Sequence, residues 1–431
     1  MEPTEPTQLD VSTLVTHALA KEKAAPRDAL RLLFDVFAVE PAHVEALALA
    51  ARVAERLRAE RETALFQALA QDPGDVQALF DLGYWFVESG LPRVGTAFLA
   101  RCHAALPHQQ QVAYELAFAR CAAGEFRAAL PLLERVADDD TTHGAMGFAA
   151  RALLVQARVF ARELDAARAD FDRLSAPQGD ADADAQIDAL AQLLARAERM
   201  TRKGEFGPRE WLYVAHGAAL LHVARNDREP LPAFTAGLDY LAGMLRRLES
   251  LLAAVDVVPG RVQWIHDSMK PLALALAERL GAEPDPYRPD HDRQTLVMLK
   301  DPRDAQQFLE DLQTREEGSD LFALSVDPRL TYSVCPELVG QFATSVRLPW
   351  EERFEFSASS AQDARLAHVD RDTRSAEALA DELVDSMIQL EGDEGDRKTL
   401  NRWYVPQKDL LLLGNYGAHP ARRVFTPRPG A

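Results

Sequence analysis

Cysteine is scarce in this chain of 431 residues, and the three that occur form no motif. Cys102, Cys121 and Cys335 lie far apart, and no C-x-x-C pair is present. This argues against a zinc site or a dithiol redox centre built from cysteine. Two of the three occupy helix-packing positions, so we expect buried, reduced thiols.

Long apolar runs and the sequence motifs of several enzyme classes are also missing. No uncharged apolar stretch approaches the roughly 20 residues that cross a bilayer, and no basic-then-apolar signal opens the chain. The patterns GxxxxGK[ST], GxGxxG, GxSxG and HExxH do not occur. We therefore predict no catalytic residue from motifs and no cofactor.

Positive charge is in the minority. The chain has 67 acidic and 48 basic residues, which gives a formal net charge of −19. Binding to nucleic acid needs clustered lysine and arginine, so neither nucleic acid nor an anionic membrane is an expected partner. The expected location is the cytoplasm, and the frequent Ala, Arg and Asp residues are typical of a bacterial source.

Residues 76–107 carry the strongest pattern in the chain. Small and large apolar residues recur there at the spacing of two antiparallel helices packed against each other. Gly83 and Gly95 mark the close approach, since two helices come together tightly only where one lacks a bulky side chain. The remaining markers are Leu79, Leu82 and Phe86 on the first helix, Gly90 at the turn, Leu99 and Cys102 on the second helix, and Pro107 at its end.

Similar units flank this helix pair. Pro41, Pro73 and Pro107 follow one another at intervals of 32 and 34 residues, and residues 111–137 repeat the pattern with Gly124 at the turn. The spacing resembles the tetratricopeptide repeat, whose period is about 34 residues. The resemblance covers residues 10–176 in five units, of which two match well.

The resemblance implies an all-α solenoid with a concave surface that binds a protein partner. The first helix of each unit usually lines that surface. The candidate groove residues are therefore Asp81, Tyr84, Glu88, Tyr114 and Arg120.

The composition changes after this region, and 431 residues exceed one ordinary core. We predict an N-terminal tail (1–9), the solenoid (10–176), an acidic linker (177–186), a capping or linking helix (187–204), an α/β domain (205–420) and a C-terminal tail (421–431).

The α/β prediction rests on alternating strand and helix patterns, which favour a largely parallel sheet covered by helices. Predicted strands are 211–214, 219–223, 262–265, 294–300, 321–326 and 409–414. Predicted helices are 238–252, 271–281, 305–312 and 375–390, and residues 350–375 and 391–400 read as loops.

The turn at 266–270 lies between a predicted strand and a predicted helix, where open α/β sheets bind ligands. Residues 262–284, VQWIHDSMKPLALALAERLGAEP, weakly resemble phosphoribosyltransferase-like domains. That family's adjacent acids and phosphate-binding loop are not found, because LFALSVDPRL has a single acid followed by proline and arginine. The candidate ligand-site residues are His266, Asp267, Ser268, Lys270 and Asp327.

Metal ligation was considered for Asp290, His291 and Asp292 in the segment YRPDHDRQ. Such residues are common in solvated loops, so we predict no metal site.

These patterns favour a cytoplasmic adaptor whose repeats hold a protein segment and whose α/β domain binds an unassigned ligand. One alternative is an enzyme with an active site around residues 266–270, which the repeats bring to its partners. Another alternative is a structural subunit of a larger assembly. An enzyme should gather the candidate residues in one pocket, whereas in an adaptor they should scatter or pair with backbone. The partner and the oligomeric state do not follow from the sequence.

Overall fold

The computed structural model divides the chain into two compact units, residues 1–179 and 180–429, and each is treated by itself. The structure describes residues 10–138, 145–200, 206–222, 231–289, 294–313, 319–328, 330, 332–357, 365–369, 371–390 and 394–413.

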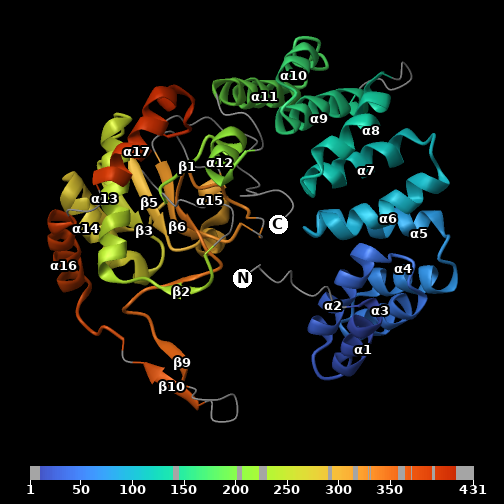
Figure 1. Ribbon diagram of the computed structural model, residues 1–431, viewed down its shortest axis with the longest axis horizontal. Helices are drawn as coiled ribbons and strands as arrows, with labels where there is room; N and C mark the ends of the chain where they lie inside the picture. Colours follow the sequence, from blue (N-terminus) through green and yellow to red (C-terminus); the bar gives the residue numbers. More distant parts are fainter. Residues whose placement is uncertain are drawn as a thin grey trace, which may run out of the picture. The chain divides into compact units, whose positions relative to one another are not determined.

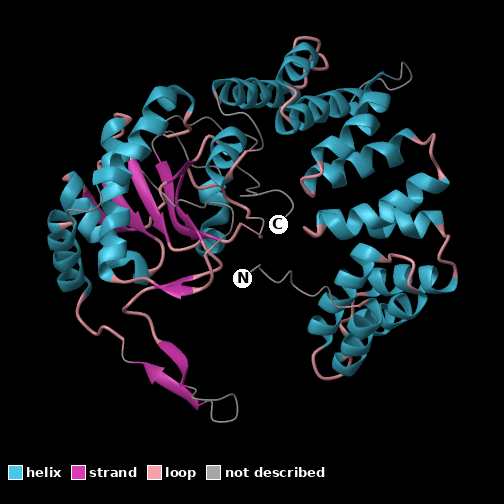
Figure 2. Cartoon of the chain, in the orientation of Figure 1, coloured by secondary structure: helices cyan, strands magenta, loops and turns pink. Residues whose placement is uncertain are grey.

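The first unit is helical throughout its described elements (Figures 1 and 2). Consecutive helices pack in pairs, and α1–α3, α5–α7 and α7–α9 also contact each other, so the pairs are stacked. The helices are α1 (Val11–Lys21), α2 (Pro26–Val39), α3 (Val44–Arg56), α4 (Glu60–Gln71), α5 (Val76–Glu88), α6 (Pro92–Ala105), α7 (Gln110–Ala122), α8 (Phe126–Asp138), α9 (Ala145–Ala161) and α10 (Leu164–Phe171).

The closest helix contact in this unit depends on two glycines. A Cβ atom on Gly83 would lie 2.7 Å from Leu99 Cγ, and one on Gly95 would lie 2.7 Å from the carbonyl oxygen of Gly83. Both distances are shorter than atoms tolerate, so α5 and α6 can approach this closely only with glycine at these positions. The role predicted for the two glycines from their spacing therefore has a geometric basis.

The second unit contains α11 (Ala181–Arg199), α12 (Pro208–His216), β1 (Ala219–Leu220), β2 (Phe234–Thr235), α13 (Leu238–Ala254), β3 (Arg261–Trp264), η1 (Asp267–Met269), α14 (Lys270–Leu280), β4 (Glu283–Pro286), β5 (Thr295–Leu299), η2 (Pro302–Phe308), α15 (Leu309–Gln313), β6 (Ser319–Val326), β7 (Leu338–Phe342), β8 (Val346–Arg347), β9 (Arg353–Ser357), β10 (Arg365–Val369), α16 (Ala376–Gln389), α17 (Glu394–Tyr404) and η3 (Val405–Leu410).

Six of these strands form one parallel sheet in the order β1-β7-β6-β5-β3-β4. Strands β5, β6 and β7 are buried along their whole length, as expected for a parallel sheet covered on both faces. Figure 1 shows α13, α14, α16 and α17 on one side of the sheet and α12 and α15 on the other. The predicted combination of a helical region and an α/β region with a parallel sheet is confirmed.

Residues 211–214 were predicted as a strand because they are aromatic and β-branched, but they lie in helix α12. Pro208 occupies the first turn of this helix, and Gly217 ends it in the left-handed conformation. These two end signals outweigh the strand preference of WLYV.

Three further predictions in the C-terminal part are wrong. Residues 409–414 are no strand: η3 ends at Leu410, and Leu412 N donates one hydrogen bond to Gly217 O. Residues 391–400 were predicted as a loop but contribute to α17, which is held by the buried side chains of Leu400 and Tyr404. The predicted loop 350–375 contains β9 and β10, which pair antiparallel with each other, and RFEFS does show the alternation of a strand.

Helix α11 begins at Ala181, inside the segment predicted as an acidic linker, and ends at Arg199. The side chain of Asp180 accepts a hydrogen bond from Ala183 N, so an acid of that segment is the helix cap. The helix contacts α12 and η3 of its own unit. None of the helices in the described part of the chain combines the length and apolar character needed to cross a membrane.

Candidate functional site

Two consecutive repeats present the same set of side chains on their first helices. Residues 77–84 of α5 read QALFDLGY, and residues 111–118 of α7 read QVAYELAF. At an offset of 34 residues, glutamine matches glutamine, an aromatic matches an aromatic twice, and an acid matches an acid. We call the six residues Phe80, Tyr84, Glu88, Tyr114, Glu115 and Phe118 the α5–α7 face.

The match extends to burial and to hydrogen bonding. Tyr84 and Phe118 are 42% and 39% exposed. Phe80 and Tyr114, one turn earlier, are half-buried. Gln77 Nε2 donates to Asp81 Oδ1 at 3.0 Å, and the equivalent bond from Gln111 Nε2 to Glu115 Oε1 measures 2.6 Å. Stacking of repeats requires recurrence only at buried positions, so recurrence at exposed positions creates a periodic surface.

Helices α5 and α7 contact each other, so their equivalent faces adjoin. The rings of Phe80 and Tyr84 stack with centroids 6.5 Å apart. Burial raises the pKa of Glu115, and the nearby carboxylate of Glu88 raises it further, while the bond from Gln111 opposes both effects. The aromatic residues therefore lie beside carboxylates that repel each other.

The predicted groove residues fall into two groups. Tyr84, Glu88 and Tyr114 belong to the α5–α7 face, and Asp81 lies beside it, bonded to Gln77. Arg120 does not belong to it: its Nη1 donates to Ala128 O at 2.6 Å, which ties α7 to α8. Phe80, Glu115 and Phe118 were missed, although comparison of the two helices at the 34-residue offset would have identified them.

The second candidate site is a cavity of about 550 Å³ at the carboxyl ends of β3 and β5. From β3 the chain passes through α14 to β4 on one side, and from β5 it passes through η2 and α15 to β6 on the other. The crevice where neighbouring strands diverge in this way is the usual ligand position in open α/β sheets. The cavity is lined by His266, Asp267, Ser268, Lys300, Arg347, Trp350, Glu351, Glu352 and Arg371.

The polar groups of this cavity largely satisfy one another. His266 Nδ1 lies 2.8 Å from Ser268 Oγ and also accepts the backbone N–H of Ser268 at 3.2 Å, so it caps η1. Trp350 Nε1 donates to Ser268 O at 2.7 Å. Lys300 and Glu351 form an ion pair at 2.7 Å. The lining has three cationic and three acidic side chains, so its charges balance.

Three of the five candidate α/β residues, His266, Asp267 and Ser268, line this cavity, and the other two do not. Lys270 pairs with Glu377 on α16 at 2.9 Å, which lowers the pKa of that carboxyl. Asp327 is buried, and its backbone N–H donates to the hydroxyl of Tyr332 at 2.8 Å.

Sequence reasoning missed Lys300, Arg347 and Trp350. Lys300 ends a predicted strand segment and was accessible to the strand-end argument, whereas the other two follow β7 in a stretch with no readable pattern. Asp290, His291 and Asp292 lie outside the described residues. Among the described residues no group of histidine, cysteine and acidic side chains has the arrangement of a metal site.

The chain matches no protein-family model, and no curated protein matches it either.

Proposed function

We propose that this protein is an adaptor that holds a protein segment against the α5–α7 face, in the manner of a tetratricopeptide-repeat groove. The observation that carries the proposal is the duplication of exposed side chains at 34 residues on adjacent helices. An exposed tyrosine or phenylalanine offers a large, rigid contact area, and aromatic residues are enriched where binding energy concentrates. A cytoplasmic location is part of the same proposal.

The chemistry of the face favours a segment that combines apolar and basic side chains. Asp81, Glu88 and Glu115 contribute three carboxylates beside the aromatic rings, and the last two repel each other. A lysine or arginine of the partner would relieve this repulsion through charge-assisted hydrogen bonds. Apolar side chains of the partner would cover Tyr84 and Phe118.

The experiment is selection of displayed peptides against the full chain, followed by affinity measurement with a selected peptide. Replacing both Tyr84 and Phe118 by alanine should weaken binding by about 10-fold or more, because truncation of central aromatic residues typically costs over 1 kcal/mol each. Glu115→Gln should weaken selected peptides that contain lysine or arginine and should spare neutral ones.

The matched control is His266→Ala with Asp267→Ala, which changes the cavity of the α/β unit and leaves the helical unit intact. Circular dichroism must show that both double variants keep the parental helix content. Equal affinity of the Tyr84/Phe118 variant and the parent would refute the adaptor proposal, as would selection of predominantly acidic peptides.

A second candidate function is binding or turnover of a small molecule in the β3–β5 cavity. Its position at the divergence of the strands favours this function. Against it, the cavity's charges balance, and the histidine serves as a cap. A small-molecule activity that is lost in the His266/Asp267 variant and retained in the Tyr84/Phe118 variant would favour the enzyme.

A further inference from the structure

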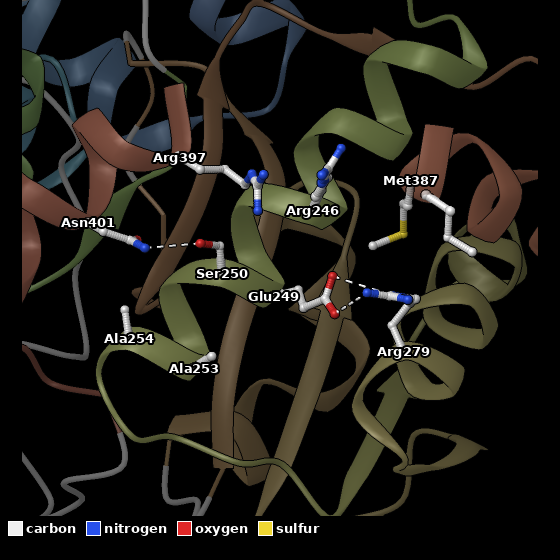
Figure 3. Close-up of a pocket in the computed structure, with 10 residues that line it drawn as sticks. Arg246, Glu249, Ser250, Ala253, Ala254, Arg279, Met387, Arg397 and Asn401 are labelled. Atoms are coloured by element: carbon white, nitrogen blue, oxygen red, sulfur yellow. Dashed lines mark hydrogen bonds and ion pairs between the residues drawn. The ribbon is translucent and has the colours of Figure 1, made fainter. Parts of the chain in front are cut away.

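A separate cavity of about 670 Å³ lies in the helical layer of the α/β unit (Figure 3). Four helices contribute to it, and none of its residues belongs to the β3–β5 cavity. Its lining comprises Arg246, Glu249, Ser250, Ala253 and Ala254 from α13, Arg279 from α14, Met387 and Ile388 from α16, and Arg397 and Asn401 from α17.

Three arginines from three helices converge on this cavity. Figure 3 shows the side chains of Arg246 and Arg397 projecting toward the same space, with the Glu249–Arg279 pair on its other side. Arg279 Nη2 lies 2.8 Å from Glu249 Oε1, and Arg246 donates to the carbonyl oxygen of Leu390. Each guanidinium has five N–H donors, so these contacts do not exhaust the hydrogen bonding of Arg246 and Arg279.

The charge of the lining is opposite to that of the whole protein. Three arginines and one glutamate leave a formal charge of +2 in the cavity, whereas the chain carries −19. Acids on the adjoining first turn of α17 have other partners: Glu394 pairs with Lys398 at 2.5 Å and Asp396 with Arg247 at 3.7 Å. The arginines of the cavity are therefore only partly neutralised by neighbouring carboxylates.

The cavity also offers an apolar wall and a hydrogen-bonding group. Ile388 is 63% exposed, and it lies next to Met387 on α16 and opposite the two alanines of α13. Asn401 Nδ2 donates to Ser250 Oγ at 3.0 Å, which leaves the amide oxygen on the same wall. Such a mixture of a concentrated charge, a few polar atoms and apolar surface is typical of small-molecule sites of about 300–1,000 Å³.

We propose that this cavity binds a small molecule that bears a phosphate group, with Arg246 and Arg397 holding the phosphate oxygens. The planar fork of a guanidinium matches two phosphate oxygens at once, and two forks from different helices enclose the group. A phosphate monoester carries about −1.5 to −2 near neutral pH, which balances the charge of the lining. The Met387–Ile388 wall would contact the organic part of the ligand.

The experiment is calorimetric titration of the full chain with inorganic pyrophosphate, with inorganic phosphate and citrate as comparison probes. Saturable binding of pyrophosphate, tighter than that of citrate, is expected. Arg246→Gln with Arg397→Gln should weaken it by about 10- to 100-fold, since a hydrogen bond to a charged group contributes about 1.5–3 kcal/mol. Arg397→Lys, which keeps the charge and removes the fork, should also weaken it.

The matched control is Arg402→Gln, which removes an exposed arginine of α17 that does not line the cavity. It should leave pyrophosphate binding unchanged. If the arginine double variant loses its fold, Ile388→Glu replaces it, because it adds a repelling carboxylate at an exposed position. Absence of saturable pyrophosphate binding to the parent, citrate binding as tight as pyrophosphate, or equal loss in Arg402→Gln would overturn the proposal.

Discussion

The helical unit and the α/β unit treat their surface chemistry in opposite ways. On the α5–α7 face, Tyr84 and Phe118 remain exposed, and the carboxylates of Glu88 and Glu115 repel each other. At the strand ends of the α/β unit, charged groups are already paired, as in Lys300 with Glu351. The first surface gains by contact with a partner, whereas the second would have to give up existing bonds.

The comparison also separates the kinds of position that matter in each unit. In the helical unit the close helix contact excludes side chains at two glycines, and the polar face above it is repeated. In the α/β unit the acids near strand ends support the backbone. Asp301, for example, accepts from Arg303 N at 2.9 Å and pairs with the Arg303 guanidinium at 2.7 Å. Three substitutions probe these differences, beginning with the largest expected effect.

Gly95→Ala should destabilise the helical unit most. Its Cβ would meet the Gly83 carbonyl oxygen, a backbone atom that cannot rotate away, and overpacking of this kind costs about 1–3 kcal/mol. The matched control is Gly243→Ala in α13, where the nearest atoms to the new Cβ are 3.9 Å away. The control should be neutral or slightly stabilising, since alanine is the better helix former. Urea unfolding measures both, and equal free energies of unfolding would contradict the packing argument.

Asp301→Ala should lower the free energy of unfolding by about 0.5–2 kcal/mol, the usual cost of losing a side-chain cap. Asp301 caps η2 and has only 9% of its side chain exposed. Asp267→Ala, which changes an acid of the β3–β5 cavity, is the control and should cost less than about 0.5 kcal/mol. Thermal and urea melts test the order, and a larger loss for Asp267→Ala would show that the cavity acids carry structure as well.

Glu115→Gln should give the smallest effect, and one that depends on pH. The pKa of Glu115 is raised in the folded chain, so the folded state binds more protons than the unfolded state above pH 4.5, the usual glutamate pKa. Stability from this group is therefore lost as the pH rises through the folded pKa. The variant, which keeps an acceptor for Gln111, should match the parent below pH 4.5 and exceed it at pH 7. Melting temperatures across this pH range provide the measurement, and a difference that does not change with pH would exclude the electrostatic cause.

The sequence predicted the helical unit better than the α/β unit because its contacts are local. Gly83, Gly95 and Leu99 lie within one repeat, so their spacing reports directly on the packing of two adjacent helices. The same 34-residue period also contains the α5–α7 face, although only Tyr84, Glu88 and Tyr114 of that face were identified. Arg120 was misassigned because helical periodicity does not show that its guanidinium reaches the carbonyl of Ala128.

By itself, the sequence determined the paired helices, the alternation of strands and helices, and the turn that follows β3, since each is set by neighbours within a few residues. Tertiary structure alone decided which distant groups meet. Trp350 bonds to Ser268 across 82 residues, and Tyr404 bonds to Leu220 across 184. It also decided that Arg196, in a segment that reads as solvated, is almost fully buried and donates to Val214 O. Local patterns fix backbone geometry, but the partners of a side chain depend on how the whole chain closes.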